Sequence, residues 1–226
     1  FEDLWPLSGD YDFNDLALKY KVVLVLNSDN NAVQIDIICN IKSNMAGFTN
    51  GIGIEIEGLT SPINQVESVT GPSYTEGYIN LNSNGTEANQ DNVVVILTDN
   101  PNNLLNETTI SIKLTNPTNT ILIGAAPFKP FLIINKIREN EVHLKGNSVT
   151  SLGNNISNIG NNHDPDGDYL SSTGYPWGIN IIHDFNKNVT LLRTLNNFVC
   201  NNSKKQNNPK NMHHIAHFAK YATYCT

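Results

Sequence analysis

The chain has 226 residues, of which 39% are hydrophobic, and its 21 acidic side chains against 14 lysines and arginines give a formal net charge of −7. Such a chain is long enough for one large all-β domain or two small ones, with a substantial core in either case. The negative charge argues against nucleic acid or an anionic membrane as a partner, because both reward clustered Lys and Arg. No apolar stretch approaches the roughly 20 residues that a membrane-spanning helix needs, so we expect no direct membrane insertion of this segment.

The pattern of the chain predicts many strands joined by turns. Short runs rich in Val, Ile, Thr and Tyr alternate with Asn, Gly, Pro and Ser, and helical periodicity is almost absent. The predicted strands, in chain order, are 16–26, 32–42, 52–58, 78–81, 92–98, 108–115, 131–135, 141–144 and 178–183. Strands at this spacing without intervening helices indicate an all-β fold, a β-sandwich of the jelly-roll kind with long polar loops.

The last third of the chain is less regular. Residues 146–174 are poor in large apolar side chains and too long for an ordinary connection, so we expect either a mobile loop or one ordered by a ligand. The run 212–225 predicts one short C-terminal helix. Cys39 lies in a strand-like run and is expected to be a buried thiol. Cys200 and Cys225 are either free or joined in a disulfide, and the disulfide would indicate an oxidising compartment.

The heptapeptide GDYDFND at residues 9–15 crowds three carboxylates and one amide before the first predicted strand. Hard oxygen ligands at i, i+2 and i+4 suit calcium, and the repulsion between close carboxylates is relieved by a cation. We expect the ligands to be Asp10, Asp12 and Asp15, with Glu2 folding back from the preceding segment and Asn14 either giving its amide oxygen or capping the turn. The alternative is a solvated turn whose Asp side chains cap backbone amides.

An EF-hand is excluded at this motif. The sixth loop position, which needs Gly, is Asp15, and the twelfth, which needs a bidentate Glu, is Lys21. A second acidic group, HDPDGDY, places Asp164, Asp166 and Asp168 at the same alternation inside the long polar stretch. It predicts either a second cation or an ordinary D-P-D-G turn.

Enzymatic motifs are weak by comparison. The chain lacks a G-x-S-x-G motif, a Walker loop and a dinucleotide fingerprint. Glu55 and Glu57 alternate as a glycosidase pair does, but carboxylates on one face of a strand more often form the wet face of a sheet. His213 and His217 have the i, i+4 spacing of a zinc clamp, but His214 stands where a metalloprotease needs Glu. We therefore expect no enzyme, and keep a hydrolase using Glu55 or Glu57 as a minor alternative.

Exposed aromatic side chains can stack on sugar rings, so each Trp and Tyr is a candidate for such a surface. Trp5 and Trp177 each lie beside a proline and a predicted strand, which favours packing in the core. Tyr74, Tyr78 and Tyr169 are the freer candidates for an exposed stacking surface.

Several phrases together resemble the LruC domain of surface and secreted proteins of Gram-negative bacteria, especially Bacteroidetes. In chain order they are FEDLWPLSGDYDFNDLALKY at 1–20, AGFTNGIGIEIEGL at 46–59, PFLIIN at 130–135, ENEVHLKG at 139–146 and DYLSSTGYPWGINI at 168–181. The opening is also similar to the acidic motif of calcium-associated β-domains in bacterial adhesins. That likeness maps onto Glu2, Asp3, Asp10, Asp12, Asn14 and Asp15. The chain departs from the family pattern where Arg138 is shifted before the EVHL phrase, in the long loop 146–168 and in the insertion 201–211.

The resemblance implies a fold and a location more than an activity. It implies one LruC-like sandwich domain over residues 1–226, as the C-terminal part of a larger protein, outside the cell and associated with the outer membrane. The expected function is non-enzymatic and calcium-stabilised, in adhesion or binding of a surface glycan. The rival is a structural or assembly subunit whose sheet edges and loops dock onto a partner protein.

Overall fold

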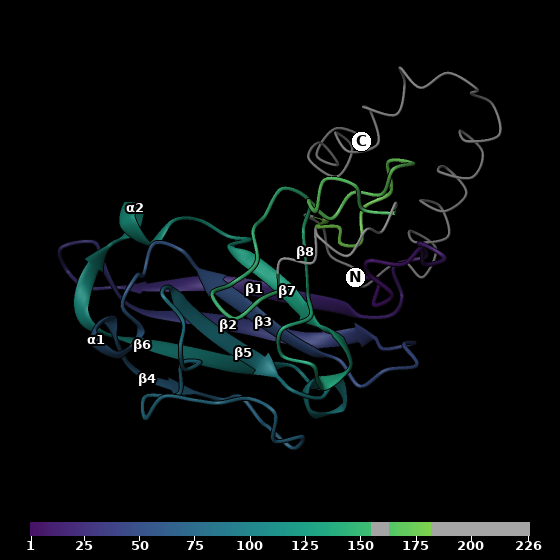
Figure 1. The fold of residues 1–226 in the computed structure, drawn as a ribbon. Helices are drawn as coiled ribbons and strands as arrows, with labels where there is room; N and C mark the ends of the chain where they lie inside the picture. Colours follow the sequence, from purple (N-terminus) through teal and green to yellow (C-terminus); the bar gives the residue numbers. More distant parts are fainter. Residues whose placement is uncertain (155–162, 182–226) are drawn as a thin grey trace, which may run out of the picture.

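The computed structural model describes residues 1–154 and 163–181 and has two four-stranded antiparallel sheets (Figure 1). The first sheet has the order β1-β2-β6-β4, made of β1 (Ala17–Leu26), β2 (Asn31–Ser43), β6 (Thr108–Asn119) and β4 (Val66–Thr70). The second has the order β5-β3-β7-β8, made of β5 (Val93–Thr98), β3 (Gly51–Ile56), β7 (Lys129–Ile133) and β8 (Glu141–His143). The predicted all-β sandwich is confirmed.

The helical elements are short and lie in the connections. They are α1 (Pro62–Gln65), η1 (Pro101–Leu104), α2 (Thr120–Ile123) and η2 (Ile134–Lys136). Asparagine side chains begin two of them, because Asn100 accepts a hydrogen bond from the backbone of Asn102 and Asn119 accepts one from that of Ile121. Within the described ranges, no helix has the length and apolar character needed to cross a membrane.

Alternation along β2 shows how the first sheet meets the core. Ile35, Ile37 and Cys39 are buried, while Asp36 and Ile38 between them are only half-buried. On β1 the residues opposite this buried row, among them Tyr20 and Val22, are partly exposed although they pack against the same core. Cys39 is a buried free thiol, as expected. Cys200, Cys225 and the predicted C-terminal helix lie outside the described residues.

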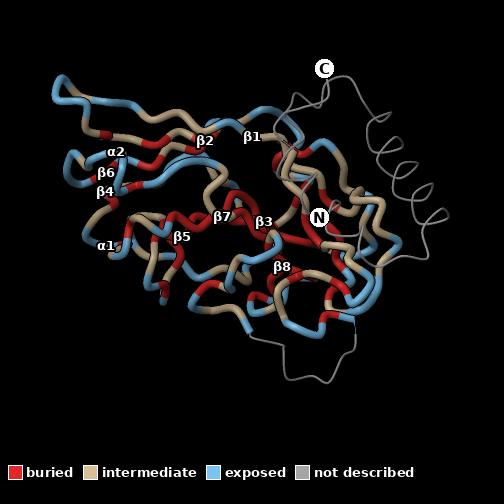
Figure 2. Tube along the Cα trace, turned by 90° about the horizontal axis from the view of Figure 1, so that it is seen from above, coloured by how far each residue is buried: buried red, intermediate tan, exposed pale blue. Residues whose placement is uncertain are grey.

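The second sheet is covered on both faces, which explains its continuous apolar runs. All six residues of β3 and of β5 are buried, and Figure 2 shows both strands inside the molecule. A second apolar cluster on the outer face joins Ile96, Phe131 and Ile133 to Tyr74 and Tyr78. The segment between β4 and β5 therefore packs over the sheet.

The structure differs from the strand prediction at three places, one strand that was missed and two predicted runs whose described residues form no strand. The prediction missed β4, whose five residues VESVT include the exposed Glu67 and Thr70 and give little hydrophobic signal. Residues 78–81 form no strand, because their tyrosine and isoleucine pack as a covering segment on the second sheet. Residues 178–181 are likewise not a strand, and 182–183 lie outside the described residues.

Candidate metal centre

Two segments from opposite ends of the described chain, 1–16 and 163–181, pack together and are called the terminal lobe below. The backbone amide of Glu2 donates to the carbonyl of Trp177 at 2.8 Å, and the Trp177 indole N–H donates to the carbonyl of Leu7 at 3.1 Å. The Trp5 indole N–H donates to Asp164 Oδ2 at 2.7 Å. Both tryptophans are buried, as predicted, and they fix one segment against the other.

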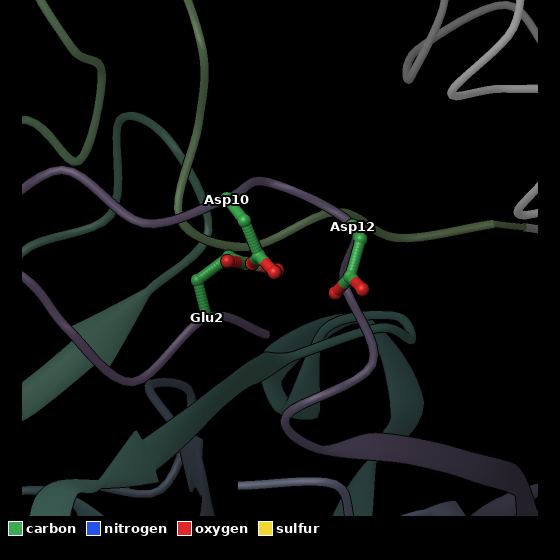
Figure 3. A group of neighbouring side chains, drawn as sticks. All are labelled: Glu2, Asp10 and Asp12. Atoms are coloured by element: carbon green, nitrogen blue, oxygen red, sulfur yellow. The ribbon is translucent and has the colours of Figure 1, made fainter.

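Glu2, Asp10 and Asp12 converge in this lobe. One carboxylate oxygen from each lies within 4.8 Å of the others, and Figure 3 shows the carboxylates of Glu2 and Asp10 together with that of Asp12 to one side. Tyr11 and Phe13 have φ angles of 55° and 57°, so the chain curls around Glu2 in the left-handed region. The backbone amides of both residues donate to the Glu2 carboxylate. The loop is thus built around one buried carboxylate.

The three carboxylates form an electrostatically unfavourable group. Burial, with smaller contributions from the charges of Asp15 and Asp10, raises the pKa of Glu2 to about 7, against a hydrogen bond from the Phe13 amide that lowers it. Burial also raises the pKa of Asp12, and the charges of Asp10 and Asp15 add to that effect. In the described part of the chain, no Lys or Arg side chain forms an ion pair with Glu2, Asp10 or Asp12.

The two other expected ligands of the first motif have different contacts. The Asn14 side-chain amide donates to Asp12 Oδ2, and its backbone amide donates to Asp12 Oδ1 at 3.2 Å. Asp12 is therefore the residue that caps the turn, and the Asn14 side chain only donates to its carboxylate. Asp15 Oδ2 accepts from the backbone amide of Asp3 at 2.9 Å, and Asp3 in turn accepts from the Asn50 side chain at 2.8 Å. Asp15 is thus not in the converging group, and it links the loop to the sandwich.

The second acidic motif is not gathered in the same way. Asp164 is buried and accepts from the Trp5 indole and from the backbone amides of Asp168 and Tyr169, at 3.3 and 3.1 Å for the two amides. Asp168 faces Lys145 at 3.4 Å, and Asp166 is exposed. Among residues 1–154 and 163–181, the only group of three or more converging His, Cys, Asp or Glu side chains is Glu2, Asp10 and Asp12. The expected second cation thus has no converging carboxylates, because Asp164 stabilises a turn instead.

The first group fits a hard cation such as calcium. Calcium binds oxygen at about 2.3–2.6 Å, so oxygens around one ion lie up to about 5 Å apart. The observed spread of 4.8 Å satisfies this limit. Because calcium takes about six to eight oxygens, three carboxylates leave room for water on the exposed side, where Asp10 lies.

The other candidate residues are engaged elsewhere. Glu55 is buried and accepts from the Asn92 side chain at 2.7 Å, while Glu57 faces Lys129 at 2.5 Å. Tyr169 is buried against Trp5, with ring centroids 4.9 Å apart. The hydroxyls of Tyr74 and Tyr78 donate to the carbonyls of Ile96 and Asp99 on the outer face of the second sheet. The three tyrosines expected as stacking platforms therefore serve packing.

Most of the described chain matches one known protein family. The model of a family described as a domain of unknown function (DUF4842) matches residues 30–190, which is more than half of the 226-residue chain. The chain belongs to this family. No curated protein and no solved structure matches it. The expected LruC resemblance stays a prediction, and the converging carboxylates precede the DUF4842 range.

Within the DUF4842 range lies a buried ionic network that the sequence interpretation missed. Arg138 donates to Glu87 and Glu141, and Glu141 also accepts from the backbone amide of Thr150 at 2.8 Å. The His143 Nε2 lies 2.7 Å from Glu141 Oε2. Burial acts to raise the pKa of Glu141, but the contacts with His143 and Arg138 outweigh it and lower the pKa. The network joins β8 to the loops at residues 87 and 150. In the sequence it is indicated by the run RENEVH at 138–143, which places Arg138, Glu141 and His143 close together.

Proposed function

We propose that this chain is a non-enzymatic, calcium-stabilised binding module of the bacterial cell surface, acting in adhesion or glycan binding. The observation that carries the calcium part is the convergence of Glu2, Asp10 and Asp12 within 4.8 Å, without a Lys or Arg ion pair in the described residues. A divalent cation offsets this repulsion and stabilises the ionised form of Glu2. Calcium would thereby order the terminal lobe.

The terminal lobe is also the proposed binding surface. Tyr11 stacks on Tyr175 with centroids 5.0 Å apart, and both rings are half-buried next to the acidic loop. Trp177 packs edge-on against Tyr11. A ligand contacting this aromatic pair would depend on calcium, because residues 10 and 12 flank Tyr11. A glycan array probed with calcium and with chelator tests this: binding only with calcium is expected, and equal binding or no binding in both conditions contradicts it.

The calcium proposal is tested by matched neutral variants. Asp10 and Asp166 are both exposed carboxylates of the terminal lobe, but only Asp10 belongs to the converging group. We expect calcium at about 100 times its Kd to raise the free energy of unfolding of the wild type by about 2.7 kcal/mol. Asp10→Asn should lose this gain and Asp166→Asn should keep it. Equal calcium responses in the two variants would contradict the assignment.

The second candidate function is a structural or assembly subunit that docks onto a partner protein. The specific observation in its favour is an open groove beside the edge strand β1. An exposed edge is a template for a strand from another chain.

A further inference from the structure

A groove of about 440 Å³ opens between the two sheets beside β1. β1 forms one wall with Leu18, Tyr20 and Val22, and Pro130 of β7 and Leu144 after β8 belong to the opposite sheet. Phe1 and Phe13 of the terminal lobe also line it, as do Lys19, Lys21 and Lys42. The Tyr20 hydroxyl donates to the Pro127 carbonyl at 3.0 Å and so joins the two walls.

The backbone of β1 is available along this groove. β1 is ten residues long, lies at the edge of its sheet and, within the described residues, pairs only with β2. The outer N–H and C=O groups of such a strand can pair with an added extended segment, and the row Leu18, Tyr20 and Val22 offers apolar contacts to its alternate side chains.

The charge of the residues that line the groove indicates the charge of the partner segment. In a chain with net charge −7, the groove is lined by Lys19, Lys21 and Lys42, and no carboxylate is among its described lining residues. Lys21 and Lys42 are exposed, and neither forms an ion pair with another described residue. A second copy that paired its own β1 here would bring lysine toward lysine, which is unfavourable. An acidic segment would instead gain attraction at both lysines.

We propose that this groove binds an extended segment of a partner protein, in which acidic side chains alternate with apolar ones, as an added strand on β1. The apolar side chains enter between the sheets, and the acidic ones face Lys21 and Lys42. This inference names the partner chemistry for the second candidate function and rests on that candidate. It does not rest on the calcium proposal, although Phe1 and Phe13 of the terminal lobe line the groove, which is why the test keeps calcium saturating.

Two synthetic peptides of eight residues test the proposal with the full chain at saturating calcium. Both have valine at alternate positions, and the others are all Glu in one peptide and all Lys in the second. Fluorescence anisotropy should show saturable binding of the Glu peptide only. Lys21→Glu combined with Lys42→Glu should weaken it about tenfold or more, since each 1.4 kcal/mol of lost attraction is a factor of about ten. The control Lys113→Glu, an exposed lysine of β6 away from the groove, should bind as the wild type does.

Hydrogen exchange locates the bound peptide. The proposal predicts that the Glu peptide slows exchange of β1 amides that exchange freely in the peptide-free monomer. If these amides are protected without peptide, the chain itself covers the edge of β1. If protection appears together with concentration-dependent dimerisation, a second copy covers it. Either result overturns the proposal. Peptide binding that Lys21→Glu with Lys42→Glu leaves unchanged would overturn the groove assignment while keeping a docking function. If neither peptide binds, the result would count against both the groove assignment and the docking function.

Discussion

At the scale of single residues, two buried carboxylates, Glu141 and Glu2, differ in how their negative charge is compensated. Glu141 is buried with Arg138 and His143 beside it, and its pKa is lowered. Glu2 is buried among other carboxylates, and its pKa is raised to about 7. The first carboxylate is therefore stabilised as an anion by the chain, whereas the second needs a proton or a cation. Both are acidic residues in the sequence, and only their neighbours in space distinguish them.

Glu2 makes the metal-free protein sensitive to pH near neutrality. Its folded-state pKa lies above the ordinary value of 4.5, so its favourable contribution is complete below pH 4.5 and is lost as the pH rises toward 7 and above. We expect the free energy of unfolding in chelator to fall between pH 5 and pH 8. Glu2→Gln should flatten this dependence, and calcium should oppose it by binding the ionised form. A free energy in chelator that rises over this range would contradict the assignment; denaturant titration at each pH measures it.

Arg138 holds two buried carboxylates, Glu87 and Glu141, and removing it should destabilise the fold strongly. Arg138→Met leaves both without their cation and should lower the free energy of unfolding by about 3–5 kcal/mol. The control is Lys113→Met, because the Lys113 pair with Glu67 is about half exposed at both side chains and such pairs contribute roughly 0–1 kcal/mol. Equal losses in the two variants would mean that the network contributes no more than a surface ion pair.

At the scale of the elements, the alternation of apolar and polar residues predicted most strands. It did not predict the segments that cover a sheet or the order in which the strands pair. The runs around β1, β2, β3 and β5 were predicted within a few residues because their Val and Ile content is high. β4 was missed because a short edge strand with polar residues resembles a loop. The segment at 78–81 was taken for a strand because a covering segment that buries Tyr78 and Ile79 has the same composition.

Gly53 of β3 illustrates a constraint that no pattern reveals. A Cβ at this position would lie 2.5 Å from the Phe131 ring, which cannot shift easily because it stacks on His143 and lies under Arg138. Gly53→Ala should therefore lower the free energy of unfolding by about 1–3 kcal/mol through overpacking. Gly47→Ala is the control, since nothing lies within 4 Å of its Cβ, and it should leave thermal and denaturant midpoints nearly unchanged. Similar midpoints for the two variants would refute the packing argument.

At the scale of the whole molecule, the candidate ligands lie close together in the sequence, but the segment that packs against them comes from the far end of the described chain. The acidic loop and its candidate ligands Glu2, Asp10 and Asp12 were predicted from their crowding at 1–15, and the structure brings these three together. Asp15 and Asp164, which were predicted as ligands as well, accept backbone hydrogen bonds outside this group, and Asn14, predicted as a ligand or a cap, donates to Asp12. The reason is that the segment at 163–181 packs on residues 1–16, so a carboxylate far along the chain binds the Trp5 indole.

We propose that one calcium ion binds between Glu2, Asp10 and Asp12 in the terminal lobe. The most direct measurement is a crystal structure of the full chain grown with calcium, with the ion identified by its anomalous signal. We expect one ion in contact with all three carboxylates, at oxygen distances of about 2.3–2.6 Å, with waters completing its coordination on the side of Asp10. Carboxylates that stay apart or bind only water at saturating calcium would contradict it.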